Sequence, residues 1–554
     1  MKRFSIALLL LLQLTLAAFA QGSQRSVVVT ENIAYRSDVG PTTVLDMAEP
    51  QAGPKSGRPA ILIIHGGGWS TGSKNDAVYR SLMVDYAMKG YVVCNMNYRL
   101  IGEADPPACL EDVRCAIRWM KANAMRLGID STRIGTFGHS AGGHLSLMAA
   151  LSAGSKAFAD DTDPWREHDC TVACSVGGAP PTELGRPGIS WGDRKELWPI
   201  GYIGSCTTPV LVIQGGEDPI VRPQLTEDWV QKMLQAGAPV DYMKVHGQHG
   251  VAFDQQLELT RPAMDAFFDR HLRPAVPAAR ASAGGVAYMA ETLWIDNGGR
   301  RIYGELYTPL FQAAKAGPTL GGEADAAGKA PVAVIAHGFN GAHDYGRNYV
   351  GTLSRLGYAC YTLDFPCGSL RSRSVAPAGP DGATGTMNMS ILDEVSDLKA
   401  VVAHFRSEGR QVVLVGESQG GLVSALTAAD LKDQVSRLVL VYPALCIPDN
   451  WRQHDPHLDD IKDVTELWGV KMGRRFFEEI HDMHPLDVIG KYRGPVLIVQ
   501  GDQDRVVSMD DSRRACKLYS KGTRLHVIPG AGHGFKPHEF GQEMEQLEQF
   551  LTLP

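Results

Sequence analysis

The sequence predicts an α/β protein with two tandem domains, each a mostly parallel, doubly wound sheet flanked by helices. The chain has 554 residues, which is more than one hydrophobic core usually serves. Short apolar runs alternate with helical patterns in both halves, as in sheets with crossover helices. The motif Gly-x-Ser-x-Gly occurs twice, at residues 138–142 and 416–420, each time between an apolar run and a helical run.

Composition and charge point to an ordinary globular chain. The sequence is 44% apolar and 21% charged, with a net charge of −7 at pH 7. No basic cluster indicates a nucleic-acid partner, and no acidic run indicates a disordered tail.

The first 20 residues have the pattern of a signal peptide. Lys2 and Arg3 provide a positive start, residues 6–16 an apolar core, and residues 18–20 a small-x-small cleavage site. The apolar run is shorter than the roughly 20 residues that span a bilayer. We therefore expect a secreted or periplasmic protein that begins near Gln21 and keeps no membrane anchor after cleavage.

The first domain is expected at residues 21–275. The run at 60–64 is continuously apolar, as in a strand that is buried on both faces. Strands are predicted at residues 27–36, 42–47, 60–64, 91–98, 133–137, 171–176, 210–213 and 242–245, and helices at 77–90, 107–127 and 261–272.

The second domain, at residues 287–554, is expected to repeat this plan after a small, featureless linker at 276–286. Strands are predicted at residues 288–295, 301–307, 332–336, 357–363, 412–415, 437–442, 496–500 and 525–528, and helices at 391–406 and 542–551.

The sequence contains ten cysteines. Cys94 and Cys360 fall in strand-like runs and are expected to be small buried apolar groups. A chain this long does not need disulfides for a core, and the sequence leaves their pairing open.

The two Gly-x-Ser-x-Gly motifs make Ser140 and Ser418 candidate nucleophiles. A serine on a sharp strand-to-helix turn has its hydroxyl raised above the sheet edge. It still needs a histidine base that is oriented by a carboxylate, in the chain order serine, acid, histidine.

Aligning the two halves selects the acids. When Gln214 is placed on Gln500, Asp218 falls opposite Asp504. The neighbouring acids, Glu217 and Asp502, face residues that are not acidic and are therefore disfavoured.

The histidines follow from the same alignment. His249 and His533 are each followed by glycine, which favours His249 over the nearby His246. The predicted catalytic residues are therefore Ser140, Asp218 and His249 in the first half, and Ser418, Asp504 and His533 in the second.

The oxyanion hole is expected in the loop after the third strand of each half. In the first half we assign the backbone amides of Gly67 and Gly68 in this loop, together with that of Ala141, which follows the nucleophile. In the second half we assign those of Phe339 in the loop and of Gln419, which follows Ser418. Loss of one such donor typically costs about 2.7–4 kcal/mol of transition-state stabilisation.

These motifs carry a family resemblance that covers nearly all of the mature chain: both halves resemble the α/β-hydrolase fold. The first half resembles hormone-sensitive-lipase-like and Bacteroidetes feruloyl-esterase-like esterases, and the second is similar to cinnamoyl/feruloyl esterases of gut bacteria. The residues that carry the first likeness are 65–69, 97–100, 110–113 and 138–143, and those for the second are 337–339, 390–395, 416–421 and 442–444. One departure is Glu417, where such enzymes more often carry histidine.

The resemblance implies an exported, bifunctional serine carboxylic ester hydrolase with two triads. It implies removal of acetyl or feruloyl groups from plant-wall polysaccharide such as xylan, so the expected partner is an esterified polysaccharide or oligosaccharide. It implies no metal or organic cofactor. Substrate choice is expected in inserts at residues 177–206 and 446–493, where the candidate substrate-binding residues are Trp191, Trp198, Trp451 and Trp468.

Several alternatives stay open. The aromatic residues of the inserts could equally well pack a lid. A serine peptidase of the prolyl-oligopeptidase type shares the fold but normally carries a propeller domain, and a broad-specificity lipase would have a more apolar lid. One half could also be a non-catalytic carbohydrate-binding module, although two complete triads disfavour this.

Overall fold

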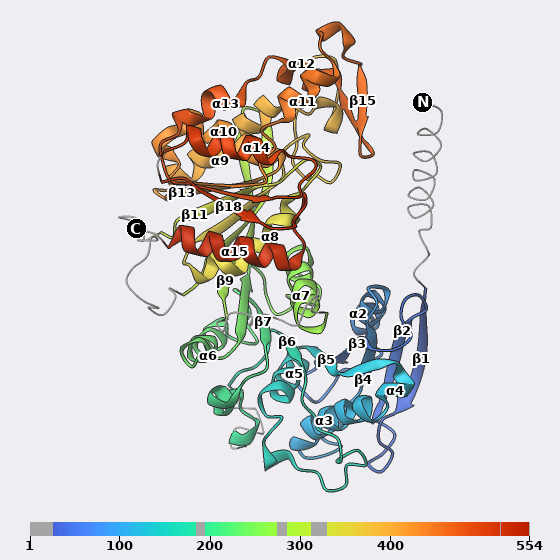
Figure 1. The fold of residues 1–554 in the computed structure, drawn as a ribbon. Coiled ribbons are helices and arrows are strands. Elements are labelled where there is room, and N and C mark those ends of the chain that lie inside the picture. Colours follow the sequence, from blue (N-terminus) through green and yellow to red (C-terminus); the bar gives the residue numbers. More distant parts are fainter. Residues whose placement is uncertain (1–25, 184–193, 274–284, 312–328, 521, 553–554) are drawn as a thin grey trace, which may run out of the picture. The chain divides into compact units, whose positions relative to one another are not determined.

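The computed structural model describes residues 26–183, 194–273, 285–311, 329–520 and 522–552 (Figure 1). Contacts divide the chain into two compact units. The first is Met1–Leu211, Ala252–Asp254 and Ala263–Arg273, and the second is Val212–Val251, Gln255–Pro262 and Pro274–Pro554. The expected signal peptide and most of the expected linker lie outside the described residues, and the expected domain limits stay a prediction.

The first unit contains a mixed sheet. Its strands are β1 (Val27–Ala34), β2 (Val44–Pro50), β3 (Arg58–Ile64), β4 (Val92–Met96), β5 (Ile129–His139) and β6 (Cys174–Gly178). They lie in the order β1-β2-β4-β3-β5-β6. The β1–β2 and β2–β4 pairs are antiparallel, and the other pairs are parallel. Strands β3, β4 and β6 are buried along their whole length, as their apolar runs predict.

Helices follow the strands of this sheet. They are α2 (Ala77–Met88), α3 (Pro107–Ala122), α4 (Ala124–Leu127) and α5 (Ala141–Leu151), with 3₁₀ turns η1 (Lys156–Phe158), η2 (Lys195–Leu197) and η3 (Pro199–Ser205). The single helix predicted at residues 107–127 is wrong in one respect, because it is interrupted at Asn123. Gly128, at φ 63°, ends α4 in the left-handed conformation that glycine tolerates best.

The second unit contains a longer sheet. Strand β7 (Val210–Gly215) leads into it from the first unit and is followed by α6 (Pro223–Gln235). The remaining strands are β8 (Val240–Val245), β9 (Ala287–Asn297), β10 (Arg300–Pro309), β11 (Val332–Ala336), β12 (Ala359–Leu363), β13 (Val412–Glu417), β14 (Arg437–Val441), β17 (Val496–Gly501) and β18 (Arg524–Ile528). Their order is β8-β9-β10-β12-β11-β13-β14-β17-β18.

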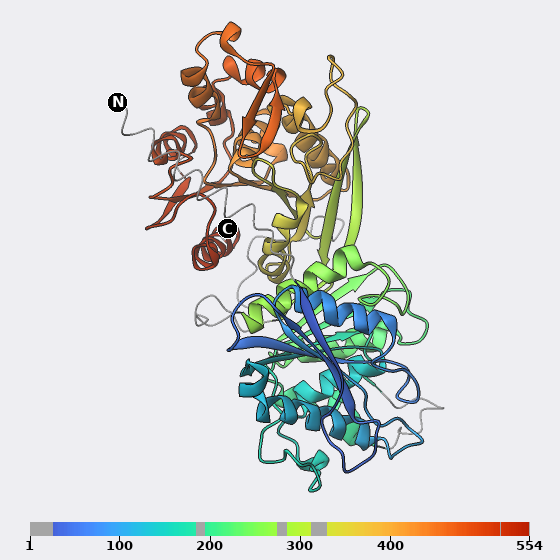
Figure 2. The same ribbon diagram turned by 90° about the vertical axis from the view of Figure 1, so that its right-hand side faces the viewer.

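Most of this sheet is parallel. The exceptions are the long β9–β10 pair, which is prominent in yellow-green in Figure 2, and the β10–β12 pair. Helices α8 (His343–Arg355) and α15 (Pro537–Leu551) lie together on one face, and α9 (Ile391–Ser407) and α10 (Gln419–Leu431) on the other (Figure 1). Two further helices are α7 (Leu257–Leu272), which is shared between the units, and α14 (Met509–Leu518).

An insert follows β14. It contains α11 (Ile447–His454), the hairpin of β15 (Val464–Leu467) and β16 (Val470–Gly473), α12 (Arg474–His481) and α13 (Pro485–Val488). The hairpin turn consists of Trp468 and Gly469, at φ 50° and 80°, and positive φ at both positions matches the twist of a hairpin. This hairpin has no clear signal in the sequence, because its strands are only four residues long.

All ten cysteines are free, and Cys94 and Cys360 are fully buried, as expected. Among the described helices, none combines the length and the apolar character that crossing a membrane requires.

Candidate active sites

Both candidate nucleophiles lie on the same type of strained turn. Ser140 joins β5 to α5 at φ 56° and ψ −121°, and Ser418 joins β13 to α10 at φ 50° and ψ −117°. Such backbone costs on the order of 1–3 kcal/mol and persists only where the surrounding structure enforces it. Here it places each serine at the N-terminus of a helix, whose dipole favours a developing negative charge.

The glycines of the two motifs are required by close backbone approach. A Cβ atom at Gly138 would lie 2.1 Å from the carbonyl oxygen of Gly142, and one at Gly142 would lie 2.1 Å from a carbonyl oxygen of β3. The equivalent distances at Gly416 and Gly420 are 2.3 and 2.2 Å. No side chain fits at these positions, so strand and helix pass as closely as the motif predicts.

The second half brings its three predicted catalytic side chains together. The Oγ atom of Ser418 lies 3.0 Å from Nε2 of His533, and Nδ1 of His533 lies 2.9 Å from Oδ2 of Asp504. The order serine, histidine, carboxylate is the arrangement in which a histidine can accept the serine proton.

Asp504 is held in place on its other side. Its Oδ1 accepts hydrogen bonds from the backbone amides of Val506 and Val507, at 2.8 and 2.9 Å. Burial raises the pKa of this carboxyl, but the hydrogen bonds from His533 and the two amides outweigh burial, so the pKa is lowered. An ionised Asp504 fixes the tautomer of His533 that has a proton on Nδ1 and a free lone pair on Nε2.

In the first half, the acid and the histidine are paired in the same way. Nδ1 of His249 lies 2.8 Å from Oδ2 of Asp218, and Oδ1 of Asp218 accepts from the amides of Ile220 and Val221 at 2.8 and 2.9 Å. Burial raises the pKa of Asp218, and the hydrogen bond from His249 leads the effects that lower it below its usual value. This pair lies in the second unit and Ser140 in the first, so the complete first triad stays a prediction.

The expected oxyanion donors of the second half lie beside Ser418. Phe339 and Gln419 line the same cavity as Ser418. Gln419 is the first residue of α10, so its amide is one of the helix N–H groups without an intrahelical acceptor. A Cβ atom at Gly338 would lie only 3.1 Å from Cβ of Ser418, so a glycine is needed where this loop passes the nucleophile.

The first half has the corresponding loop. A Cβ atom at Gly66 would lie 3.5 Å from Cβ of Ser140. Gly67 and Gly68 follow at φ 113° and 58°, and Ala141 begins α5. The three predicted donors therefore belong to the loop and the helix that flank Ser140.

A buried histidine stabilises each of these loops, a role that was not predicted from the sequence. Nδ1 of His65 lies 2.7 Å from the carbonyl oxygen of Gly66, and Nδ1 of His337 lies 2.8 Å from that of Gly338. Nε2 of His337 accepts from the amide of Phe365, so its proton is on Nδ1. Burial lowers the pKa of both histidines, which keeps them neutral.

The side chain of Gln419 is anchored by Glu394. Its Nε2 lies 2.9 and 3.0 Å from the two carboxyl oxygens of Glu394, on α9. Burial raises the pKa of Glu394 to about 8. The residue that provides a predicted oxyanion donor is thus fixed by a contact between residues 25 positions apart.

Glu417 belongs to a buried acidic network behind Ser418. The hydroxyl of Tyr349 lies 2.7 Å from Glu417 and 2.6 Å from Glu543 on α15. One phenol proton can be donated to only one carboxylate, so the second short contact requires a protonated carboxyl group as donor. Burial raises the pKa of Glu417 to about 7 and that of Glu543 well above its usual value.

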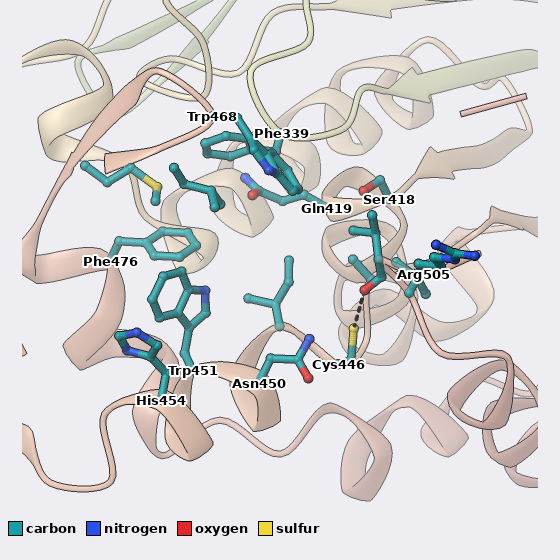
Figure 3. Close-up of a pocket in the computed structure, with 16 residues that line it drawn as sticks. Phe339, Ser418, Gln419, Cys446, Asn450, Trp451, His454, Trp468, Phe476 and Arg505 are labelled. Atoms are coloured by element: carbon teal, nitrogen blue, oxygen red, sulfur yellow. Dashed lines mark hydrogen bonds between the residues drawn. The ribbon is translucent and has the colours of Figure 1, made fainter. Parts of the chain in front are cut away.

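A cavity of about 370 Å³ opens beside Ser418 (Figure 3). Two of the four predicted substrate-binding residues, Trp451 and Trp468, line it. Trp198 lies between two 3₁₀ turns of the first unit and does not line it, and Trp191 lies outside the described residues. The cavity is mainly apolar, and its lining includes Phe339, Ile447, Trp451, Leu467, Trp468 and Phe476.

Two regions of the chain match known families. The BD-FAE family model matches residues 45–190, and the alpha/beta hydrolase family model matches residues 333–547. Esterase LipC of Mycobacterium tuberculosis is 26% identical over 259 residues, which is 42% of this chain and 61% of LipC. Carboxylesterase NlhH of the same species is 39% identical over 97 residues, which is 17% of this chain and 30% of NlhH. The chain thus spans less than two thirds of either relative.

Among solved structures, Est1E from Butyrivibrio proteoclasticus with bound ferulic acid is 26% identical with a TM-score of 0.39. The match covers 47% of this chain and 97% of Est1E. The matched regions contain most of the strands described for each unit and both Gly-x-Ser-x-Gly turns. The chain therefore contains α/β-hydrolase domains in two regions, each a mostly parallel sheet flanked by helices.

Proposed function

We propose that this protein is an exported serine carboxylic ester hydrolase with two catalytic sites. The observation that carries the proposal is the continuous contact from Ser418 through His533 to Asp504 at the edge of an apolar cavity. The repeat of the same motifs around Ser140, together with the Asp218–His249 pair, supports a second site of the same kind.

At the second site, Ser418 attacks the ester carbonyl carbon while Nε2 of His533 takes the hydroxyl proton. The negative charge that forms on the carbonyl oxygen is stabilised by the backbone amides of Phe339 and Gln419. Protonated His533 then donates its proton to the leaving alcohol, and the acyl group stays on Ser418. A water molecule, deprotonated by His533, releases the acid and restores the serine.

We propose that the substrates are acetyl or feruloyl esters of plant-wall polysaccharide such as xylan. The support at the second site is the aromatic lining of the cavity next to Ser418. The ring centroids of Trp451 and Phe477 are 4.5 Å apart, and those of Trp468 and Phe339 are 5.9 Å apart. Aromatic walls of this kind suit a flat aromatic acyl group. The inserts of the two halves differ in length, so we expect the two sites to prefer different acyl groups.

The test is hydrolysis of acetylated xylan and of a feruloylated arabinoxylan oligosaccharide by the wild type, Ser140→Ala and Ser418→Ala. We expect each variant to lose one activity and keep the other. If one substitution leaves both activities intact, that half is a non-catalytic module. If only a small aryl acetate is cleaved, by a serine-dependent reaction, the catalytic assignment stands and the polysaccharide assignment is wrong.

A further inference from the structure

A single arginine lines the cavity of the second site. Arg505 follows Asp504 directly, and its side chain makes no hydrogen bond or ion pair with any residue in the described part of the chain. The only other side chain of the lining that can carry a positive charge is His454, whose Nδ1 lies 2.9 Å from Oδ1 of Asp455. Arg505 is therefore an exposed, unpaired positive charge at the rim of the cavity.

The internal repeat shows that the loop does not need this arginine. In both halves the aspartate accepts from the second and third amides that follow it, at 2.8 and 2.9 Å. The residue between is Pro219 in the first half and Arg505 in the second. Since the same loop forms with a proline there, the Arg505 side chain is available for another role.

Arg505 lies on the nucleophile side of the cavity. In Figure 3, Arg505 and Ser418 lie on one side, and Trp451, Phe476 and His454 lie on the other. When the carbonyl carbon of an ester lies at Ser418, its acyl group and its alcohol part extend in different directions. An apolar acyl group fits the aromatic side, which directs the alcohol part towards Arg505.

We propose that Arg505 forms an anion-binding subsite, which selects esters whose alcohol part carries a carboxylate, as in a sugar acid. This deepens the proposed function of the second site and rests on it. A guanidinium group donates two parallel N–H bonds to a carboxylate, with more geometric specificity than an ammonium group has. The chain has a net charge of −7, so a local cation of this kind would favour the binding of an anionic substrate.

The catalytic test uses a matched pair of esters in full-length protein that carries Ser140→Ala, so that only the second site acts. The esters are 4-acetoxybenzoate and 4-acetoxybenzamide, which differ in the charge of the leaving group. The measured quantity is the kcat/KM of the anionic ester divided by that of the neutral ester. We expect Arg505→Gln to lower this ratio by about 3- to 10-fold, which is the effect of losing a charged hydrogen bond at a partly exposed position. Arg505→Lys should retain part of the preference for the anionic ester. Added salt should lower the ratio in proteins that carry Arg505 or Lys at this position, but not in Arg505→Gln.

Arg513→Gln is the matched control, because it removes the same charge from an exposed site on α14 where Arg513 pairs with Asp510. It should leave the ratio unchanged. An equal ratio in Arg505→Gln and the parent, or an equal fall in Arg513→Gln, overturns the subsite.

Binding provides a readout that needs no turnover. In Ser418→Ala, NMR titration should show that 4-hydroxybenzoate binds several-fold more tightly than 4-hydroxybenzamide, and that Arg505→Gln removes this difference. If neither ester is hydrolysed but the binding difference holds, the proposed catalysis fails and the subsite stands. If hydrolysis proceeds and Arg505→Gln alters neither the binding difference nor the ratio, the subsite fails and the catalysis stands.

Discussion

The most informative residue of the second site is Glu417, which occupies a position where the resembling enzymes more often carry histidine. It is buried directly before Ser418 and shares a proton with Glu543 through Tyr349. Tyr442 extends this network towards the catalytic histidine, because its ring lies 4.8 Å from that of His533. The charge state of the acid pair therefore acts on the environment of the catalytic base.

Glu417→Gln should change how stability depends on pH. The pKa of Glu417 rises from 4.5 to about 7 on folding, so between these values the folded chain holds a proton that the unfolded chain has lost. The contribution of Glu417 to stability is therefore greatest below pH 4.5 and decreases as pH rises through 7. We expect Glu417→Gln to be more stable than the wild type at pH 8, by about 1–3 kcal/mol, and to lose this advantage near pH 5.

Thermal unfolding of the two proteins across this pH range measures the effect. Glu466→Gln, which changes an exposed residue of β15, is the control and should show no advantage that depends on pH. A constant difference between Glu417→Gln and the wild type from pH 5 to 8 would contradict a shared proton.

At the scale of elements, the strand-to-helix turn at Ser418 depends on how closely β13, β11 and α10 approach. Gly420 brings the first turn of α10 against the carbonyl end of β11, where the atoms it meets are backbone atoms that cannot rotate away. By contrast, Gly541 lies within α15 and faces open space. Both positions are glycine, but a Cβ atom at Gly420 would clash with backbone atoms, whereas one at Gly541 would meet no atom within 4 Å.

Gly420→Ala should destabilise the second domain by at least about 1–3 kcal/mol, because the added methyl group displaces the backbone of the turn. It should also slow the labelling of Ser418 by a fluorophosphonate. Gly541→Ala should stabilise the protein by up to about 1 kcal/mol, since alanine is the better helix former. Thermal unfolding and labelling rates of the two variants test the pair, and equal effects would show that the close approach at Gly420 is unimportant.

At the scale of the whole molecule, the sequence repeat and the pairing of strands suggest different boundaries between the two domains. The repeat places β8 in the first domain and β9 in the second. In the structure the two strands pair in parallel over Tyr242–Ala287 to Val245–Ala290, within one compact unit. A cut in the expected linker would therefore leave one edge of β9 without a partner.

A fragment of residues 276–554 should consequently self-associate more than the full chain, because an unpaired edge strand is a template for intermolecular pairing. Size-exclusion chromatography with light scattering over a range of concentrations measures this. We also expect the fragment to unfold at a lower temperature than the corresponding transition of the full chain. A fragment that stays monomeric with an unchanged transition would show that β8 adds nothing to the second domain.

The sequence by itself determined most strands of the two sheet regions, but not the short β15–β16 hairpin, and it determined the two nucleophile turns and the internal repeat that relates the two halves. A continuous apolar run such as residues 60–64 predicts a strand that is buried on both faces, whatever path the chain takes afterwards. The glycines of Gly-x-Ser-x-Gly report a local backbone approach. The repeat also selected Asp504 over Asp502, and the structure places Asp504 against His533.

Other features were decided only by the tertiary structure, because they depend on segments that are far apart in sequence. The contact of Tyr349 with both Glu417 and Glu543 connects α8, β13 and α15. The local periodicity of each element does not predict that these three elements lie together. The unpaired state of Arg505 and the position of Trp468 over the cavity likewise follow from the path of the chain. Local patterns report which face of an element is buried, but the fold alone decides which groups meet there.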